Sequence, residues 1–404
     1  MVKFMLFKKC TTLILIGILI SFQPLIAQLP TVIPAGNLVC RVAVFAPLYL
    51  DSIFHGARLA SERSIPKYVM PSLDFVQGAQ IGLDSLDLSG QNVEAYIYDT
   101  KSTSQPLAWL IQNKLLDSIN LIIGSVKDVD FKQLSDFSLK KNIPFISATY
   151  PNDGGITANP FVAIVNSTLR AHVEGIYSYI FENHGTDKVY LCRKRGSQED
   201  KIASYFKELN DQEGKPLVSI QTLYFDSSIS TSYFKNKVDS LHPVVIIGGS
   251  LDEDFARELT DAVYAVGKKN FPITLIGMPN WDGLRFFQRR DAYKDFPIHF
   301  TTPYYNAKAD QNYNLLSSEY MKRFKSKPSD IACKGFEIAQ YFTKLALQYP
   351  NEVMSHLNEK KSRIFSEYNF RPVFLKKNTG TPDYFENKHL YVMKIVNGSI
   401  IREW

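Results

Sequence analysis

The sequence predicts an α/β protein built from two units, each a parallel β-sheet with helices on both faces. Three observations support this fold class. Short apolar, β-branched segments alternate with amphipathic helical segments, the alternation restarts near Leu169, and 404 residues allow two or three domains at roughly 150 residues each. Because strands buried on both faces form continuous apolar runs, the pattern favours parallel sheets over antiparallel ones.

The first unit begins with the apolar strand 41–46, which Pro47 ends. Apolar residues then recur at helical spacing over 75–86, after a possible cap at Ser72. The alternation continues with expected strands 92–98, 121–124 and 144–147 and expected helices 105–118 and 129–140.

The second unit repeats this order at similar size. Its expected helices are 169–181, 199–210, 232–241 and 254–266, and its expected strands are 188–192, 218–225, 243–248 and 273–277. No period of 20 to 50 residues recurs along the chain, so a solenoid is excluded.

The remainder of the chain predicts a mixed region. Expected strands are 297–302, 370–375 and 390–404, and expected helices are 313–324 and 334–348. The dipeptide Asn397-Gly398 divides the last strand into a hairpin, because both residue types tolerate positive φ. Gly380, Pro382 and several charges indicate an exposed loop between Asn378 and Lys388.

The N-terminus predicts a signal peptide over residues 1–27. Lys3, Lys8 and Lys9 precede the short apolar run 13–22, and the small residue Ala27 follows at the position that signal peptidase requires. We therefore expect cleavage after Ala27 and a periplasmic, soluble mature chain.

Two other interpretations of the N-terminus fit less well. A membrane anchor needs ~20 apolar residues, whereas this run is interrupted by Ser21, Gln23 and Pro24. A lipoprotein needs a cysteine directly after the apolar run, but Cys10 precedes it and Cys40 lies beyond a polar stretch.

Charge and motifs exclude several function classes. Lys and Arg outnumber Asp and Glu by 46 to 40, and three of the six excess positive charges lie in the predicted signal peptide. This balance is too weak to indicate nucleic acid as a partner. Dinucleotide, P-loop, zinc-protease and nucleophile-elbow motifs are missing from the sequence, so we expect no enzyme, no cofactor and no metal.

The cysteines of the predicted mature chain are Cys40, Cys192 and Cys333. Their odd number and wide spacing exclude a disulfide framework or a CxxC metal site. Apolar surroundings favour free core thiols, although one disulfide among the three remains open.

Two charged clusters have alternative interpretations. Asp252-Glu253-Asp254 lacks the alternating ligands and glycine of a calcium loop, and Asp254 can cap the helix that begins there. Arg193-Lys194-Arg195, between a strand and a helix, is either a solvated loop or an anion contact at a helix N-terminus.

Ligands of open α/β sheets bind beyond the carboxyl ends of parallel strands. This rule selects the loops 47–49, 125–128, 148–150, 193–195, 249–253 and 280–282.

The ordered set of motifs resembles the type I periplasmic-binding-protein fold family. The similarity is to branched-chain amino acid binding proteins and to ABC transporter substrate-binding proteins of Bacteroidetes-type bacteria. It covers about residues 40–404, and the segments that carry it are Val42-Ala-Val-Phe-Ala-Pro47, Phe75 to Leu86, Tyr96-Ile-Tyr-Asp-Thr100, Leu121-Ile-Ile-Gly-Ser125, Ile143 to Thr149, Val244-Val-Ile-Ile-Gly248 and Leu275-Ile-Gly-Met-Pro279.

The resemblance implies two Rossmann-like lobes with a ligand in the cleft between them. Lobe 1 combines 40–163 with 282–348, and lobe 2 combines 164–281 with 349–404. The three chain crossings would lie near 161–166, 281–284 and 348–353.

The resemblance also implies a binding site for an amino acid-like ligand. Backbone N–H groups and hydroxyls at Ser125, Ala148 and Thr149 would hold the ligand's carboxylate. An acidic residue of the second lobe, Asp252 or Glu253, would meet its ammonium. Trp281 or Tyr150 would form an apolar wall.

The sequence departs from that pattern at two loops, so a larger or anionic ligand is also an expectation. Ser125-Val126-Lys127-Asp128 replaces a hydroxyl-rich run, and Arg193-Lys194-Arg195 replaces an aromatic residue. The expected function is an exported solute-binding protein that closes on a small polar ligand for a membrane transporter or sensor. The alternative is a cell-envelope interaction or regulatory protein that uses the same fold without a small-molecule ligand.

Overall fold

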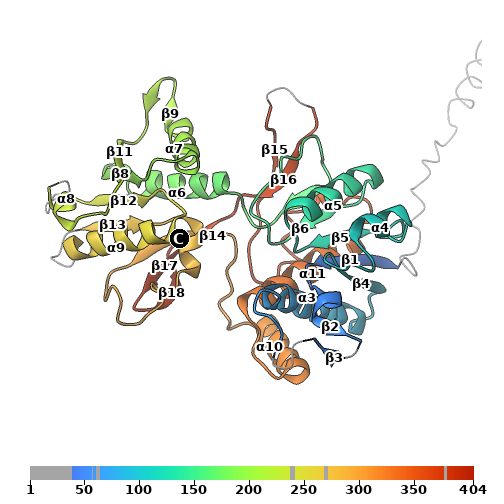
Figure 1. Ribbon diagram of the computed structural model, residues 1–404. Coiled ribbons are helices and arrows are strands. Elements are labelled where there is room, and N and C mark those ends of the chain that lie inside the picture. The colour runs from blue at the N-terminus through green and yellow to red at the C-terminus, as the bar shows by residue number, and fades with distance from the viewer. Residues whose placement is uncertain (1–38, 57, 61–63, 237–241, 268–271, 377–379) are drawn as a thin grey trace, which may run out of the picture. The chain divides into compact units, whose positions relative to one another are not determined.

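The computed structural model describes residues 39–56, 58–60, 64–236, 242–267, 272–376 and 380–404. The predicted signal peptide (1–27) and the end of the predicted helix 232–241 lie outside these residues. The described chain contains two seven-stranded sheets, each with helices packed against it (Figure 1). The predicted α/β class is therefore confirmed.

The first sheet has the strand order β15-β16-β7-β6-β5-β1-β4, and only β15 runs antiparallel to its neighbour. Its strands are β1 (Cys40–Ala46), β4 (Val93–Asp99), β5 (Leu121–Gly124), β6 (Phe145–Ser147), β7 (Val162–Ile164), β15 (Phe370–Val373) and β16 (Tyr384–Asn387). The central strands β1, β5, β6 and β7 are almost wholly buried, which explains their continuous apolar sequences.

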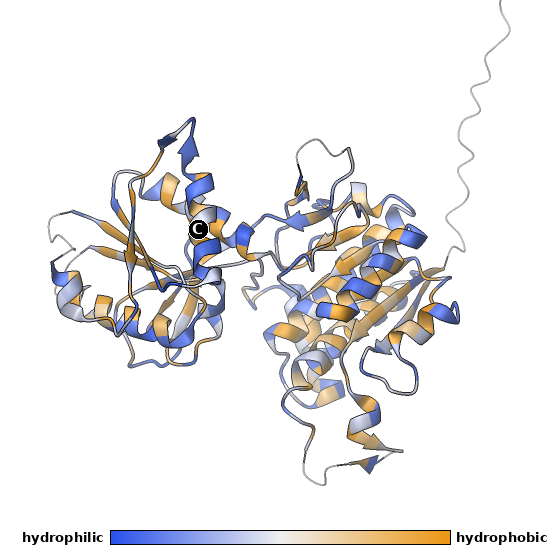
Figure 2. Cartoon of the chain, turned by 45° about the horizontal axis from the view of Figure 1, so that its top comes forward, coloured by the Kyte–Doolittle hydropathy of each residue, from blue (hydrophilic) through white to orange (hydrophobic). Residues whose placement is uncertain are grey.

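Helices cover both faces of the first sheet. One face packs against α3 (Met70–Leu88), α10 (Gln311–Phe324) and α11 (Asp330–Gln348), and the other against α4 (Leu107–Gln112) and α5 (Asp128–Lys141). Successive side chains of β1 pack against opposite faces: Val42 and Val44 lie on the face covered by α3, α10 and α11, and Ala43 and Phe45 lie on the face covered by α4 and α5. Figure 2 shows hydrophobic residues concentrated along the strands.

Glycines allow α3 and α11 to pack closely. A Cβ atom built at Gly78 would lie 1.9 Å from the carbonyl oxygen of Ala332, and one at Gly335 would lie 2.0 Å from that of Phe75. Each helix therefore uses a glycine where the backbone of the other helix approaches.

The second sheet has the order β11-β8-β12-β13-β14-β17-β18, with β11 to β14 parallel and the last two strands antiparallel. Its strands are β8 (Lys188–Arg193), β11 (Ile220–Tyr224), β12 (Val244–Gly248), β13 (Ile273–Ile276), β14 (Ile298–Thr302), β17 (Tyr391–Val396) and β18 (Ser399–Arg402). Its helices are α6 (Leu169–Asn183), α7 (Ser197–Leu209), α8 (Thr231–Lys235) and α9 (Glu253–Gly267). Asn397 and Gly398 both have positive φ, at 50° and 73°, so the predicted β17–β18 hairpin turn is confirmed.

Three segments carry the chain between the two sheets: 165–168 after β7, 303–310 after β14, and 388–390 after β16. Hydrogen bonds link the first of these segments to the end of β16. The Ser167 hydroxyl donates to the carbonyl of Asn387 at 2.6 Å, and the backbone N–H of Thr168 donates to the carboxylate of Glu386 at 2.8 Å. The first crossing lies close to the predicted 161–166.

The other two predicted crossings, near 281–284 and 348–353, were wrong, and the strand content of the predicted lobes changes with them. β14 lies in the second sheet although 282–348 was assigned to lobe 1, whereas β15 and β16 lie in the first sheet although 349–404 was assigned to lobe 2. The exposed loop expected at 378–388 contains β16. Only two of the four residues of β16, Tyr384 and Phe385, are apolar, and the buried Glu386 and Asn387 interrupt the apolar run that predicts a strand.

Two local predictions also differ from the structure. Ser72 is a buried residue inside α3, which begins at Met70, rather than its cap. The helix expected at 105–118 ends at Gln112, because turns with Lys114 at positive φ follow it.

Candidate functional site

Two hydroxyl residues lie side by side at the carboxyl edge of the first sheet. Ser125 follows β5 and Thr149 follows β6, and the neighbouring strands bring their Oγ and Oγ1 atoms to 3.0 Å from each other. The backbone fixes both loops, since Ser125 N–H donates to the Phe45 carbonyl at 2.8 Å and Asn166 Nδ2 donates to the Thr149 carbonyl at 2.7 Å. Each hydroxyl can also bond to a ligand.

Ala148 and Tyr150 flank Thr149 in the same loop. Ala148 is buried, and its carbonyl accepts a hydrogen bond from the Tyr304 hydroxyl. The Tyr150 hydroxyl donates to Asp128 at 3.1 Å, and burial, followed by this carboxylate, raises the pKa of Tyr150. Both groups are thus already engaged within the first lobe.

In the second lobe, Asp252 lies at the start of α9. One of its oxygens accepts from the backbone N–H of Phe255 at 2.7 Å, and the other lies 3.1 Å from Nζ of Lys194. The Phe255 N–H, followed by Lys194, lowers the pKa of Asp252. Asp252, rather than the predicted Asp254, therefore caps the helix, and its charge is already paired. Glu253 is exposed in the first turn of α9.

Trp281 does not form an exposed wall. It is fully buried, and its indole packs against the backbone at Gly248 and Gly277. The short 3-10 helix η1 (Pro279–Gly283) turns the side chain into the core of the second lobe, where a Cβ at Gly277 would lie 1.9 Å from the ring. The expectation that Trp281 lines a ligand site is therefore corrected.

The basic cluster after β8 is fully paired. Arg193 contacts Asp200, Lys194 contacts Asp252, and Arg195 contacts Asp226. Both arginines also lie over the Tyr224 ring, at 5.2 Å and 4.9 Å from its centroid. These pairs reduce the charge that the cluster offers to an anion.

Two residues that sequence reasoning missed lie near the first-lobe hydroxyls. Lys334, in α11, places Nζ 4.0 Å from the centroid of the Tyr304 ring, and Tyr304 in turn bonds to Ala148. Burial lowers the pKa of Lys334. Sequence pattern offers no signal for this contact, because a crossing segment and a helix thirty residues later meet only in the folded chain.

A buried carboxylate in α11 also supports the crossing segment 303–310. Glu337 accepts hydrogen bonds from the backbone N–H groups of Phe365 and Ser366 and, at 3.0 Å, from the Ser366 hydroxyl. Ser366 Oγ also accepts from the Tyr305 N–H at 3.3 Å. Burial raises the pKa of Glu337 to about 7. The crossing at 303–310 is thereby linked to α11 through one titratable group.

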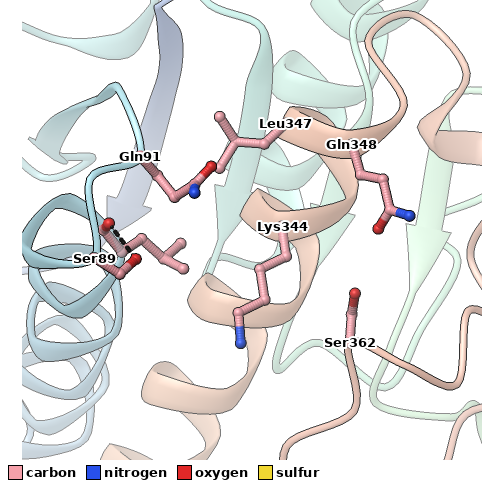
Figure 3. A pocket seen from close by; sticks show the side chains of 7 residues that line it. Ser89, Gln91, Lys344, Leu347, Gln348 and Ser362 are labelled. Atoms are coloured by element: carbon pink, nitrogen blue, oxygen red, sulfur yellow. Dashed lines mark hydrogen bonds between the residues drawn. The ribbon is translucent and has the colours of Figure 1, made fainter. Parts of the chain in front are cut away.

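Two cavities of the described chain lie at the opposite, amino edge of the first sheet. A cavity of about 300 Å³ lies between the ends of α3 and α11, where Figure 3 shows Ser89, Gln91, Lys344, Gln348 and Ser362 around it. A second cavity, of about 470 Å³, is lined by residues that precede β6 and β7, including Pro144 and Phe161. Neither contains a predicted site residue.

Other site types find no support within the described ranges. No group of three or more His, Cys, Asp or Glu side chains there could hold a metal ion. The three cysteines described are buried and free, as predicted. None of the described helices is long and apolar enough to cross a membrane.

No family model and no curated protein matches this sequence, but solved structures share its fold. A putative branched-chain amino acid ABC transporter protein from Rhodospirillum rubrum is 12% identical, with 91% of this chain and 100% of that chain covered and a TM-score of 0.62. A periplasmic ligand-binding protein of a branched-chain amino acid ABC transporter from Burkholderia xenovorans is 12% identical (91% and 95% covered, TM-score 0.57). This chain has the type I periplasmic-binding-protein fold.

A third structure of the same fold holds a ligand. It is an ABC transporter substrate-binding protein from Desulfitobacterium hafniense in complex with Leu, 11% identical, with 91% of this chain and 100% of that chain covered and a TM-score of 0.54. The predicted type I architecture is confirmed, and the similarity extends over nearly all of the described chain.

Proposed function

We propose that this protein is an exported solute-binding protein that holds a small polar ligand, amino acid-like or anionic, for a membrane transporter or sensor. The observation that carries the proposal is the Ser125–Thr149 hydroxyl pair at adjacent strand ends. Paired hydroxyls with fixed backbones can bond to a ligand without large rearrangement, and strand ends of this kind are where open α/β sheets bind ligands. Structures of the same fold named as transporter substrate-binding proteins support the same class.

The proposal includes export to the periplasm and a function without catalysis. The basic and apolar N-terminal pattern of residues 1–27 supports export. N-terminal sequencing of the protein from the envelope fraction tests it: Gln28 as the first residue is expected, and an intact Met1 in a cytoplasmic fraction would contradict it.

One observation favours the alternative of an envelope interaction protein without a small ligand. Of the second-lobe groups expected to contact a ligand, Asp252 is already paired with Lys194, and Arg195 is paired with Asp226. A protein that uses only its outer surface needs no free groups there. Small-molecule binding decides between the two functions.

The test is a thermal-shift screen of the purified protein against amino acids, peptides, sugars and small anions, followed by calorimetric titration of each compound that stabilises it. Thr149→Ala should lower the affinity of the protein for such a compound by roughly 5- to 150-fold, because one lost hydrogen bond in a desolvated site costs roughly 1–3 kcal/mol. Ser204→Ala removes an exposed hydroxyl bonded only to the Lys201 carbonyl, and it should change nothing. Equal affinity in Thr149→Ala and the unmodified protein would place the ligand elsewhere.

A further inference from the structure

β4 is an open edge strand of the first sheet. It pairs with β1 on one side, and within the described residues no strand pairs with its other side (Figure 1). Cys40 N–H donates to the Asn92 carbonyl at 2.9 Å, which fixes the residues of β4 that bond to β1. Because bonding alternates along a parallel strand, the N–H and C=O groups of Val93, Ala95 and Ile97 point away from β1.

The sequence of β4 lacks the features that usually block an edge. Of the four edge strands described in the two large sheets, β4 is the longest, with seven residues against five in β11 and four each in β15 and β18. β15 carries Arg371 and Pro372, whereas β4 contains no lysine, arginine or proline. Its two acidic side chains are already engaged, Glu94 with Arg41 at 2.7 Å and Asp99 with backbone N–H groups of the loop after β1.

Both faces of β4 expose large apolar side chains at the middle of the strand. Tyr96 is 38% exposed and Ile97 is 42% exposed, and successive residues of a strand lie on opposite faces. On the tyrosine face, the rings of Tyr96 and Tyr98 are nearly parallel at 6.5 Å, and Tyr98 stacks on Phe45 of β1 at 5.0 Å. An added strand would bury both faces and continue this row of rings.

We propose that two copies of this protein form a symmetric dimer, in which β4 pairs antiparallel with β4 of the partner subunit about a two-fold axis at Tyr96. In this register Ala95 and the partner's Ile97 exchange N–H···O=C bonds, because the free groups of both residues point outward. Tyr96 lies opposite the partner's Tyr96, so the row of rings continues across the axis.

The charges of β4 suit a second copy of the same strand. Glu94 lies opposite the partner's Tyr98, and Asp99 lies opposite the partner's Val93, so no like charges face each other. The two Glu94 positions are four residues of strand apart, about 13 Å, which exceeds the screening length of ~8–10 Å. A two-fold contact uses up the edge of both copies, so it gives a closed dimer and not a fibre.

The dimer leaves the proposed ligand site open. β5 and β6, whose carboxyl ends carry Ser125 and Thr149, are separated from β4 by β1. Self-association and ligand binding can therefore be measured independently.

Analytical ultracentrifugation of the purified protein tests the proposal at concentrations from about 1 to 100 µM, because small interfaces associate weakly. The average mass should rise with concentration from that of one chain to that of two. Ile97→Lys should weaken self-association roughly tenfold or more, because it removes apolar burial and places a lysine at the edge.

Ile401→Lys is the matched control. Ile401 is also an isoleucine of an edge strand, β18, and is 45% exposed. This variant should dimerise as the unmodified protein does.

A disulfide tests the register without depending on the strength of the contact. Opposed residues at the axis have Cα atoms about 4.5 Å apart, within reach of a disulfide. Tyr96→Cys should therefore form a covalent dimer in a glutathione redox buffer. Tyr224→Cys, which changes an exposed tyrosine of the edge strand β11, should not.

Three results would overturn the inference. They are a monomer at every concentration, equal self-association of Ile97→Lys and Ile401→Lys, and a Tyr96→Cys protein that forms no covalent dimer. Hydrogen exchange adds a fourth test, because the amides of Ala95 and Ile97 should be protected only at concentrations at which the dimer forms. Protection of these amides in a monomer would mean that another segment of the same chain covers β4, and it would also overturn the inference.

Discussion

Glu337 should make the stability of this protein depend on pH. The carboxylate is 2% exposed, and burial raises its pKa from 4.5 to about 7. In the unfolded chain it loses its proton near pH 4.5, while the folded protein keeps the proton until about pH 7. The folded state therefore binds more protons in this window, so the free energy of unfolding falls as the pH rises through it. The two pKa values differ by an amount equivalent to about 3 kcal/mol.

Glu337→Gln isolates this contribution. The amide oxygen can still accept from the backbone N–H groups of Phe365 and Ser366, and the amide nitrogen can donate to the Ser366 hydroxyl. Relative to the unmodified protein, the variant should gain about 3 kcal/mol of unfolding free energy between pH 4 and pH 8. Urea denaturation followed by tryptophan fluorescence measures the difference at each pH.

The control is Glu213→Gln, which changes an exposed carboxylate, and its stability should follow that of the unmodified protein at every pH. A difference between Glu337→Gln and the unmodified protein that stays constant from pH 4 to pH 8 would refute the reasoning. It would mean that Glu337 ionises in the folded protein as readily as in the unfolded chain.

Two further predictions concern packing and the thiols. Gly335→Ala should lower the urea midpoint by an amount equivalent to roughly 1–3 kcal/mol, because the new methyl group would collide with the Phe75 carbonyl. Gly283→Ala is the control and should change the midpoint little, because the space around Gly283 is open. Equal midpoints in the two variants would contradict the close contact between α3 and α11. Burial raises the pKa of Cys40 to about 11 and that of Cys333 to about 12. A thiol reagent at pH 8 should therefore modify the described cysteines, all of which are buried, only after denaturation. Rapid labelling of the native protein would contradict their burial.

Most strands of the two sheets could be predicted because burial on both faces requires continuous apolar sequences. The apolar runs at 41–46 and 244–248 are buried on both faces of their sheets, so their apolar residue types alone indicate a buried strand. β16 carries this signal only in Tyr384 and Phe385, since Glu386 and Asn387 are buried by hydrogen bonds to the first crossing rather than by apolar packing. Its omission displaced the third predicted crossing, whereas the second was displaced because the strand 297–302, which is β14, was assigned to lobe 1.

The site was predictable only where it follows the strand-end rule. Ser125 and Thr149 were selected because each follows a strand, and the parallel pairing of β5 and β6 brings them together. The indole of Trp281 points into the core, a direction set by the tight turn of η1 and not by residue type. The contact between Lys334 and Tyr304 could not be predicted, because the strand-end rule selects only loops, whereas Lys334 lies in a helix and Tyr304 in a crossing segment.

A crystal structure of the protein with the compound that stabilises it most would test the central claim directly. The ligand should lie at the carboxyl edge of the first sheet, with a polar group within hydrogen-bond distance of the Ser125 or Thr149 hydroxyl. A ligand seated instead in the cavity beside Lys344, or one that leaves both hydroxyls without a contact, would contradict the account.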